Sequence, residues 1–268
     1  MNNQDGGCIL RPISLRQHIK SVSCGKEHVL LLSRIGIVMS MGIGSRGQLG
    51  HGDTENQSEP KVIEAIEAVT MVTVSAGGWH SVALSDIGDL YVWGWNESGQ
   101  LGLPCRTVQD HRSAAVGKSM SAEEDRCSPP PTHCSDSARS MVSTGRECNL
   151  TAADESGKRE VIHPPDNSSH VDSEDEYVNL QTIPVAMDFP CATEEQEVMV
   201  SKVSCGSRHT AVVTETGALW TWGWNGYGQL GLGDTNSRDM PTRVDGHFSD
   251  VQDVHCGYWT TIVVAKEN

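Results

Sequence analysis

The stretch CysGlySerArgHis, residues 205–209, decides the fold because close copies of it recur along the chain. The copies are CysGlyLysGluHis at 24–28, AlaGlyGlyTrpHis at 76–80 and CysGlyTyrTrpThr at 256–260. Their shared glycines follow one another at intervals of 52, 129 and 51 residues. Two nearly equal intervals and one longer one predict repeated units of about 50 residues with a single large insertion.

A second motif has the same period. GlyGlnLeuGly occurs at 47–50, 99–102 and 228–231, again with steps of 52 and 129 residues. Two independent motifs with one spacing exclude a chance match. A period in this range is typical of solenoids and propellers.

Each unit has the pattern of short β-strands. The histidine of the motif opens an apolar run at 28–33, 80–85 and 209–214, and a glycine turn leads to a second run at 37–43, 90–95 and 219–224. The ends of the units supply ProLysValIle at 60–63 and ProValAlaMet at 184–187 as a fourth strand. Four strands in a unit of this size predict a propeller blade, whose two faces need neighbouring blades to cover them.

Composition excludes several classes of function. The chain of 268 residues has 35 acidic and 20 basic residues, a net charge of −15, and a pI of about 5.1. Non-specific binding to nucleic acid is therefore not expected, because it depends on Lys and Arg. Without a long apolar run or a charged-then-apolar start, we expect no membrane contact and a nuclear or cytoplasmic protein that is not secreted.

The cysteines fit a reducing compartment. Cys24, Cys205 and Cys256 occupy the same place in three units, where the other unit has Ala76. A position that accepts Cys or Ala predicts a small buried slot, and equivalent positions on separate blades do not pair. We therefore expect buried free thiols.

The segment 104–180 departs from the repeat. It is rich in Ser and Pro and poor in aromatic residues, so we expect a disordered loop within one blade. Ser173, which is followed by three acidic residues, is a possible phosphorylation site. Zinc is not expected, because its scattered residues Cys105, His111, Cys127, His133, Cys134 and Cys148 contain no CxxC pair. The expected organisation is an N-terminal extension (1–19), two repeats (20–103), the insertion (104–180), a third and a partial fourth repeat (181–265), and a tail (266–268).

Residues that resemble catalytic groups are better explained by the repeat. His28, His80 and His209 stand at one place in three units, whereas a catalytic group is normally needed once, so we interpret them as structural hydrogen bonders. GlyIleGlySerArgGly at 42–47 matches the dinucleotide pattern, but no helix follows it. Asn96 and Asn225 replace its Gly44, which predicts a left-handed turn position there. We expect no enzyme activity, cofactor, small-molecule substrate or metal.

The tryptophans suggest two roles. The repeated Trp93, Trp95, Trp222 and Trp224 fit either packing between blades or an aromatic surface for a partner. Residues without counterparts in every unit are better candidates for specific partner contacts: Trp79, Arg208, Tyr227 and Trp259. The remaining repeated positions are expected to be structural: Gly25, Gly50, Gly77, Gly102, Gly206, Gly231 and Gly257.

The units resemble the repeat of the regulator of chromosome condensation family. The likeness is carried by GlySerArgHisThr, GlyAlaLeuTrpThrTrpGly and GlyGlnLeuGlyLeuGlyAsp, and covers about residues 20–103 and 180–265. It implies an all-β, seven-bladed propeller, of which this chain would hold about four blades.

The second unit is most similar to a vertebrate member of that family. This resemblance implies a non-enzymatic scaffold for protein–protein interaction in chromatin regulation, with a jumonji-type histone demethylase or hydroxylase as partner. Two alternatives stay open: a guanine nucleotide exchange factor for the small GTPase Ran, and a truncated chain without independent function.

Overall fold

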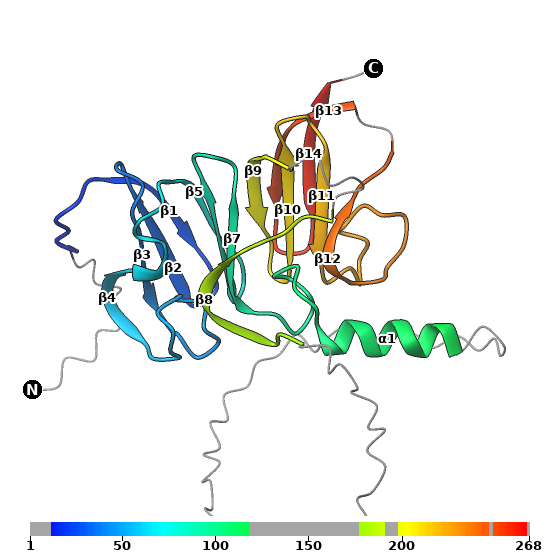
Figure 1. Cartoon of the computed structure of the whole chain (residues 1–268), viewed down its shortest axis with the longest axis horizontal. Helices are drawn as coiled ribbons and strands as arrows, with labels where there is room; N and C mark the ends of the chain where they lie inside the picture. Colours follow the sequence, from blue (N-terminus) through cyan, green and yellow to red (C-terminus); the bar gives the residue numbers. More distant parts are fainter. Residues whose placement is uncertain (1–11, 118–176, 191–197, 247–248, 267–268) are drawn as a thin grey trace, which may run out of the picture. The chain divides into compact units, whose positions relative to one another are not determined.

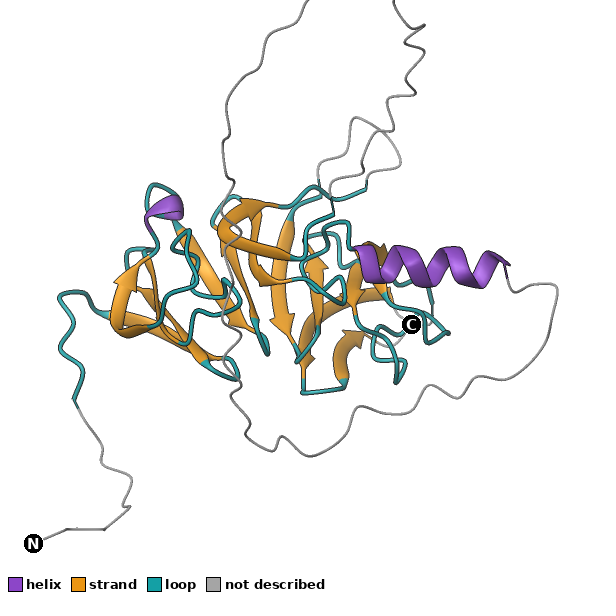
Figure 2. Ribbon diagram, turned by 90° about the horizontal axis from the view of Figure 1, so that it is seen from below, coloured by secondary structure: helices purple, strands orange, loops and turns teal. Residues whose placement is uncertain are grey.

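The computed structural model describes residues 12–117, 177–190, 198–246 and 249–266, without the side chains of 112–117 and Ser249. These residues form three four-stranded antiparallel sheets and one two-stranded sheet. Strands supply nearly all the regular structure (Figure 2). The fold is all-β, as the sequence predicts.

The sheets follow the order of the chain, from blue to red in Figure 1. The first contains β1 (Ile19–Cys24), β2 (His28–Ser33), β3 (Val38–Gly42) and β4 (Gln57–Val62). The second contains β5 (Met71–Ala76), β6 (His80–Ser85), β7 (Leu90–Trp95) and β8 (Leu180–Ala186). The third contains β9 (Val200–Cys205), β10 (His209–Thr214), β11 (Leu219–Gly223) and β12 (Arg238–Arg243), and the last contains β13 (Ser249–Cys256) and β14 (Thr261–Lys266).

The runs that open with the repeated histidine are strands with the expected limits in the first three sheets. The fourth strands begin earlier than the sequence suggested, at Gln57 and Leu180. The reason is pairing: Gly42 lies opposite Gln57, and Trp95 lies opposite Leu180. A short 3₁₀ helix, η1 (Glu64–Ile66), links the first sheet to the second.

Both faces of an inner sheet are covered. In β6 every residue is buried, and successive side chains enter different cores. Ala83 packs toward the first sheet, while Val82 and Leu84 pack toward the third. This follows from the period of two in a strand, and it explains why the apolar residues of β6, Val82, Ala83 and Leu84, are consecutive and do not alternate with polar ones.

A polar relay joins each sheet to the next. Thr210 Oγ1 donates to the Gln100 carbonyl oxygen (2.9 Å) and therefore accepts from His80 Nε2–H (3.0 Å). His80 Nδ1 has no partner among the described residues, as expected for the unprotonated nitrogen. The same relay runs from His28 through Ser81 to Gln48 and from His209 through Thr261 to Gln229.

The glycine of the motif makes room for the histidine ring. A Cβ on Gly77 would lie 2.1 Å from His80 Cε1, and one on Gly206 would lie equally close to His209 Cε1. No side chain fits there, which accounts for the repeated Gly-x-x-His spacing.

The expectation of a left-handed residue at Gly44 is wrong. The described residues with positive φ include neither Gly44 nor its counterparts Asn96 and Asn225. Glycine is required at 44 because a Cβ would lie 2.1 Å from the Glu55 carbonyl oxygen. The asparagines are instead loop organisers: Asn96 Oδ1 accepts from Leu101 N at 2.9 Å.

The expectation of disorder is wrong for the start of the insertion. Residues Arg106–Gly117 form a helix, α1, between β7 and β8. It is anchored by the buried Cys105 and Val108, and by Asp239, which accepts from Cys105 N and Gln109 Nε2. A carboxylate at a helix N-terminus is stabilising. The insertion was predicted to end at residue 180, but the chain has already returned to the sheet at Val178, whose N donates to the Pro104 carbonyl oxygen. Residues 118–176, including Ser173, lie outside the described residues.

Candidate interaction surface

Two kinds of loop meet at one end of the strands. The loop before β2, β6, β10 or β14 carries position 27, 79, 208 or 259. The loop after β3, β7 or β11 carries position 46, 98 or 227. Adjacent sheets bring these positions together, so the repeat builds a surface whose residues differ from sheet to sheet.

The first part of this surface is a cation–aromatic cluster of Lys26, Glu27, Arg46, Trp79, Trp95 and Arg208. The rings of Trp79 and Trp95 meet edge to face with centroids 5.4 Å apart. Arg46 lies over both rings, at 4.7 and 4.8 Å from their centroids. Arg208 lies 4.9 Å from the Trp95 centroid, and Lys26 lies 4.3 Å from that of Trp79. Three cations thus surround two half-buried indoles.

Glu27 fixes one edge of the cluster. Its carboxylate accepts a 2.8 Å hydrogen bond from Trp79 Nε1 and lies 3.7 Å from Arg46. One carboxylate faces three cations within the cluster. In a chain with a net charge of −15, this is a local positive surface.

The second part is a four-ring cluster of Trp224, Tyr227, Tyr258 and Trp259. Trp224 contacts Tyr227 at 5.0 Å and Trp259 at 4.9 Å, and Tyr258 contacts Trp259 at 5.0 Å, all edge to face. Tyr227 is 57% exposed and Tyr258 is 54% exposed. An aromatic cluster with two exposed members is a suitable anchor for a protein partner.

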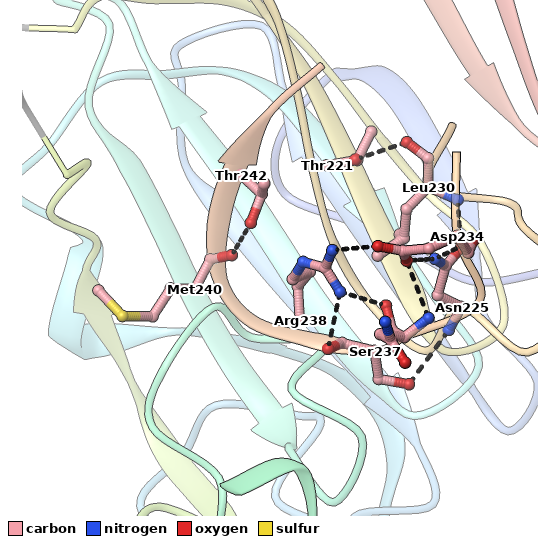
Figure 3. Close-up of polar contacts among 9 residues, drawn as sticks. Thr221, Asn225, Leu230, Asp234, Ser237, Arg238, Met240 and Thr242 are labelled. Carbon is pink, nitrogen blue, oxygen red and sulfur yellow. Dashed lines mark hydrogen bonds and ion pairs between the residues drawn. The ribbon is translucent and has the colours of Figure 1, made fainter. Parts of the chain in front are cut away.

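Hydrogen bonds order the loop after β11 that carries Tyr227, and Figure 3 shows those of Asn225, Asp234 and Arg238. Asn225 accepts from Leu230 N and donates from Nδ2 to the Asp234 carbonyl oxygen, both at 2.9 Å. Arg238 Nη2 donates to Asp234 Oδ2 at 2.7 Å. Desolvation opposes ionisation of Asp234, but the Arg238 hydrogen bond and further contacts outweigh it and lower the pKa of this carboxyl. The loop is therefore preorganised.

A shallow cavity of about 230 Å³ lies where the motif loops of the four sheets converge. Its lining includes Cys24, Cys205 and Cys256. Burial raises the pKa of Cys205 to about 12 and that of Cys256 to about 11, so these thiols are protonated and unreactive at neutral pH. The expectation of a buried slot is wrong for Cys24, which is exposed. Cys205 packs toward the preceding sheet, and no described residue forms such a sheet beside Cys24.

Burial lowers the pKa of His80 to about 3 and those of His28 and His209 to about 4, so all three are neutral at pH 7. No three described His, Cys, Asp or Glu side chains lie together as metal ligands would. No described helix is long and apolar enough to cross a bilayer.

The structure brings the candidate contact residues together in pairs. Arg208 Cζ lies 6.0 Å from the Trp79 ring centroid, and the ring centroids of Tyr227 and Trp259 are 6.1 Å apart. Trp93 and Trp222 are fully buried between sheets, where their Nε1 atoms donate to the Gln48 and Gln100 carbonyl oxygens. Packing between sheets therefore applies to Trp93 and Trp222, whereas Trp95 and Trp224 lie half-buried in the surface clusters, where a contact with a partner stays a prediction.

Sequence reasoning missed four residues of the clusters: Lys26, Glu27, Arg46 and Tyr258. Glu27 stands at the repeat position of Trp79 and Arg208, and Arg46 at that of Tyr227. Alignment of the repeats by position could have found them, because the surface uses equivalent places in each unit.

Known proteins share these repeats. The chain matches the family described as Regulator of chromosome condensation (RCC1) repeat at residues 36–84, 88–116 and 216–264. A second family description of the same repeat matches residues 71–100 and 200–229.

Curated relatives extend over nearly the whole chain. The human RCC1 domain-containing protein 1 is 39% identical over 96% of this chain and 59% of its own length. The Ultraviolet-B receptor UVR8 of Arabidopsis thaliana is 33% identical over 93% of this chain and 51% of its own length. The chain therefore spans between half and three fifths of these relatives.

Among solved structures, Prp20p of Saccharomyces cerevisiae superposes with a TM-score of 0.59 at 19% identity, over 94% of this chain and 44% of that one. This likeness supports the propeller fold. The repeats, their spacing and their sheets together show that the chain belongs to the family of RCC1-repeat β-propeller proteins.

Proposed function

We propose that this chain is a non-enzymatic scaffold that binds a protein partner through the cation–aromatic and four-ring clusters. The observation that carries the proposal is the stacking of Lys26, Arg46 and Arg208 around Trp79 and Trp95. Trp, Tyr and Arg are the residues in which the binding energy of protein interfaces concentrates.

The charge of the cluster favours an acidic segment on the partner. Three cations against one carboxylate would attract such a segment and orient it over the indoles. The adjoining tyrosines Tyr227 and Tyr258 would contact apolar groups of the same partner and hydrogen-bond through their hydroxyls.

The finer proposal is a role in chromatin regulation, with a jumonji-type histone demethylase or hydroxylase as partner. It rests on the resemblance of the second repeat to a vertebrate family member associated with such an enzyme. The yeast protein Prp20p binds Gsp1p and histones, which is consistent with protein partners for this fold.

The test is calorimetric titration of the purified chain with a purified jumonji-type hydroxylase domain. We expect binding that weakens at least about tenfold in Trp79→Ala and in Arg46→Glu. Ile87→Ala is the matched control, because Ile87 is 60% exposed at the opposite end of the β6–β7 hairpin. Absence of binding would exclude this enzyme as the partner, and equal binding by all variants would exclude the cation–aromatic cluster as the binding surface.

A parallel assay separates the main alternative. Guanine nucleotide release from Ran is measured with and without the chain at micromolar concentration. We expect no acceleration, and a clear acceleration would favour an exchange factor over the scaffold.

A further inference from the structure

A second cavity, of about 210 Å³, lies between the first sheet, η1 and β8. Its lining comes from the loop after β3, from β4, from η1 and from β8, and consists of Gly50, His51, Lys61, Glu64, Ala65 and Ile183. Each of the two sheets that it touches has all four of its strands. None of the lining residues belongs to either aromatic cluster, so the cavity is separate from the proposed partner surface.

The linkers that follow β4 and β8 begin alike, which fixes the equivalent positions of this region in the next unit. Ile63 N donates to the carbonyl oxygen of the first residue of β3, at 3.0 Å. Met187 N makes the same bond to the first residue of β7, at 2.8 Å. Two residues further along each linker stand Ala65 in the first unit and Phe189 in the second.

Phe189 packs its ring against the next sheet. The ring meets Trp220 and Trp222 edge to face, with centroid distances of 5.7 and 6.1 Å. Tyr91 and Trp93 are the residues at the equivalent strand positions one sheet earlier. Alanine at position 65 has no ring to place against them. By repeat position, the cavity therefore lies where the next junction holds a phenyl ring.

Two other lining positions carry polar groups at this junction alone. His51 stands where the next unit has Leu103, and Lys61 stands where it has Val185. Both of those apolar residues pack against the core between the second and third sheets. Glu64, in contrast, has an acidic counterpart in the other units. The first junction has thus lost an aromatic ring and gained two hydrogen-bonding side chains at one place.

His51 presents a hydrogen-bond acceptor. Ser40 Oγ donates to the Leu49 carbonyl oxygen at 2.7 Å, and therefore accepts from His51 Nε2–H at 2.9 Å. Burial, and after it the charge of Lys61, lower the pKa of His51 against the opposing effect of two carboxylates, so the ring is neutral at pH 7. Its Nδ1 keeps a lone pair, to which no described residue donates.

Lys61 presents a donor at the same cavity. Its side chain is exposed, and its ammonium group makes no hydrogen bond or ion pair with the part of the chain that the structure describes. An acceptor and a donor thus line one cavity, with the aliphatic side chain of Ile183 as an apolar wall.

We propose that this cavity binds a small phenol. The ring of the ligand takes the place that the Phe189 ring has at the next junction and packs against Ile183. Its hydroxyl group donates to His51 Nδ1 and accepts from Lys61 Nζ, so that one group satisfies both side chains. A cavity of this size admits a single aromatic ring, which is smaller than the usual ligand of a protein pocket.

The probe is 4-methylphenol, titrated into the full chain while the imidazole nitrogen resonances are followed by NMR. We expect a dissociation constant of about 1 mM and a shift of the His51 Nδ1 resonance. The matched probes are 4-methylanisole, which cannot donate a hydrogen bond, and toluene, which has no oxygen. Both should bind at least about fivefold more weakly. Equal affinities for the three compounds, or an unchanged His51 resonance, would overturn the proposal.

Three variants locate the site. Ala65→Phe supplies the ring of the next junction, and we expect at least about tenfold weaker binding of 4-methylphenol because the cavity is filled. Ala68→Phe is its matched control, since Ala68 is exposed in the same linker and does not line the cavity. His51→Leu should abolish the preference for 4-methylphenol over 4-methylanisole. Equal affinities in the two phenylalanine variants, or a preference that persists without His51, would contradict a phenol site here.

Discussion

The junction between the second and third sheets and the junction between the third and fourth share one polar relay but differ in their apolar content. His80, Thr210 and Gln100 form the relay in the first case, and Trp222 lies fully buried beside it. His209, Thr261 and Gln229 form it in the second, where no described indole completes the packing. The comparison teaches that the same relay joins adjacent sheets at both junctions, whereas in the described residues a buried indole lies beside it at only one of them.

Acid should weaken every junction and has the largest expected effect. His28, His80 and His209 have folded pKa values of about 4, 3 and 4, below the value of about 6.5 in an unfolded chain. Between the folded and the unfolded pKa values, the unfolded state therefore binds more protons than the folded state. Stability is complete above pH 6.5 and falls below it toward pH 4, by up to about 1.4 kcal/mol per pH unit for each histidine.

Chemical denaturation at pH 7.5, 6.0 and 5.0 measures this dependence. A control is His255→Gln, because His255 is 66% exposed and lies outside the relays. The variant should follow the wild-type curve, and a pH-independent stability would contradict neutral, buried histidines.

Trp222→Ala should weaken the packing between the second and third sheets and leave the other junctions unchanged. Truncation of a fully buried tryptophan costs about 3–5 kcal/mol. The measurement is the free energy of unfolding in urea, with Trp220→Ala as a less buried partner on the same strand. If the two substitutions reduce the free energy of unfolding equally, the burial of the Trp222 indole against the Gln100 carbonyl oxygen adds no particular stability.

Thr210→Val and Thr261→Val compare the relay at the two junctions. Each removes the hydroxyl that accepts from a histidine. In the buried junction the unpaired His80 Nε2–H should cost about 1–3 kcal/mol. Thr261 is only partly buried, so its replacement should cost less than that of Thr210. Equal losses would show that both junctions exclude water alike.

Trp79→Ala should have the smallest effect on stability, about 0.5–1 kcal/mol, since its cation contacts lie at the surface. Thermal unfolding measures the loss. A loss as large as that of Trp222→Ala would mean that the cation–aromatic cluster is part of the core and not a contact surface.

The repeat allowed the strands and the placement of the insertion to be predicted. The motif spacing and the glycine turns depend on local geometry, which the sequence carries directly. The helix at Arg106–Gly117 could not be predicted, because it forms against Asp239, more than a hundred residues away. The mistake at Gly44 has the same origin: its constraint is the Glu55 carbonyl oxygen across a loop and not its own φ.

The sequence by itself determined the blade and its period, because hydrophobic runs, turn glycines and the Gly-x-x-His spacing are properties of one unit. Only the tertiary structure decided the roles of equivalent residues, because the faces of each sheet pack against neighbouring sheets. Cys24 is exposed, whereas Cys205 is buried. Gly102 lies against the Trp222 indole, whereas no described indole lies against the equivalent Gly231. These differences arise from the neighbours of each sheet, which no single unit encodes.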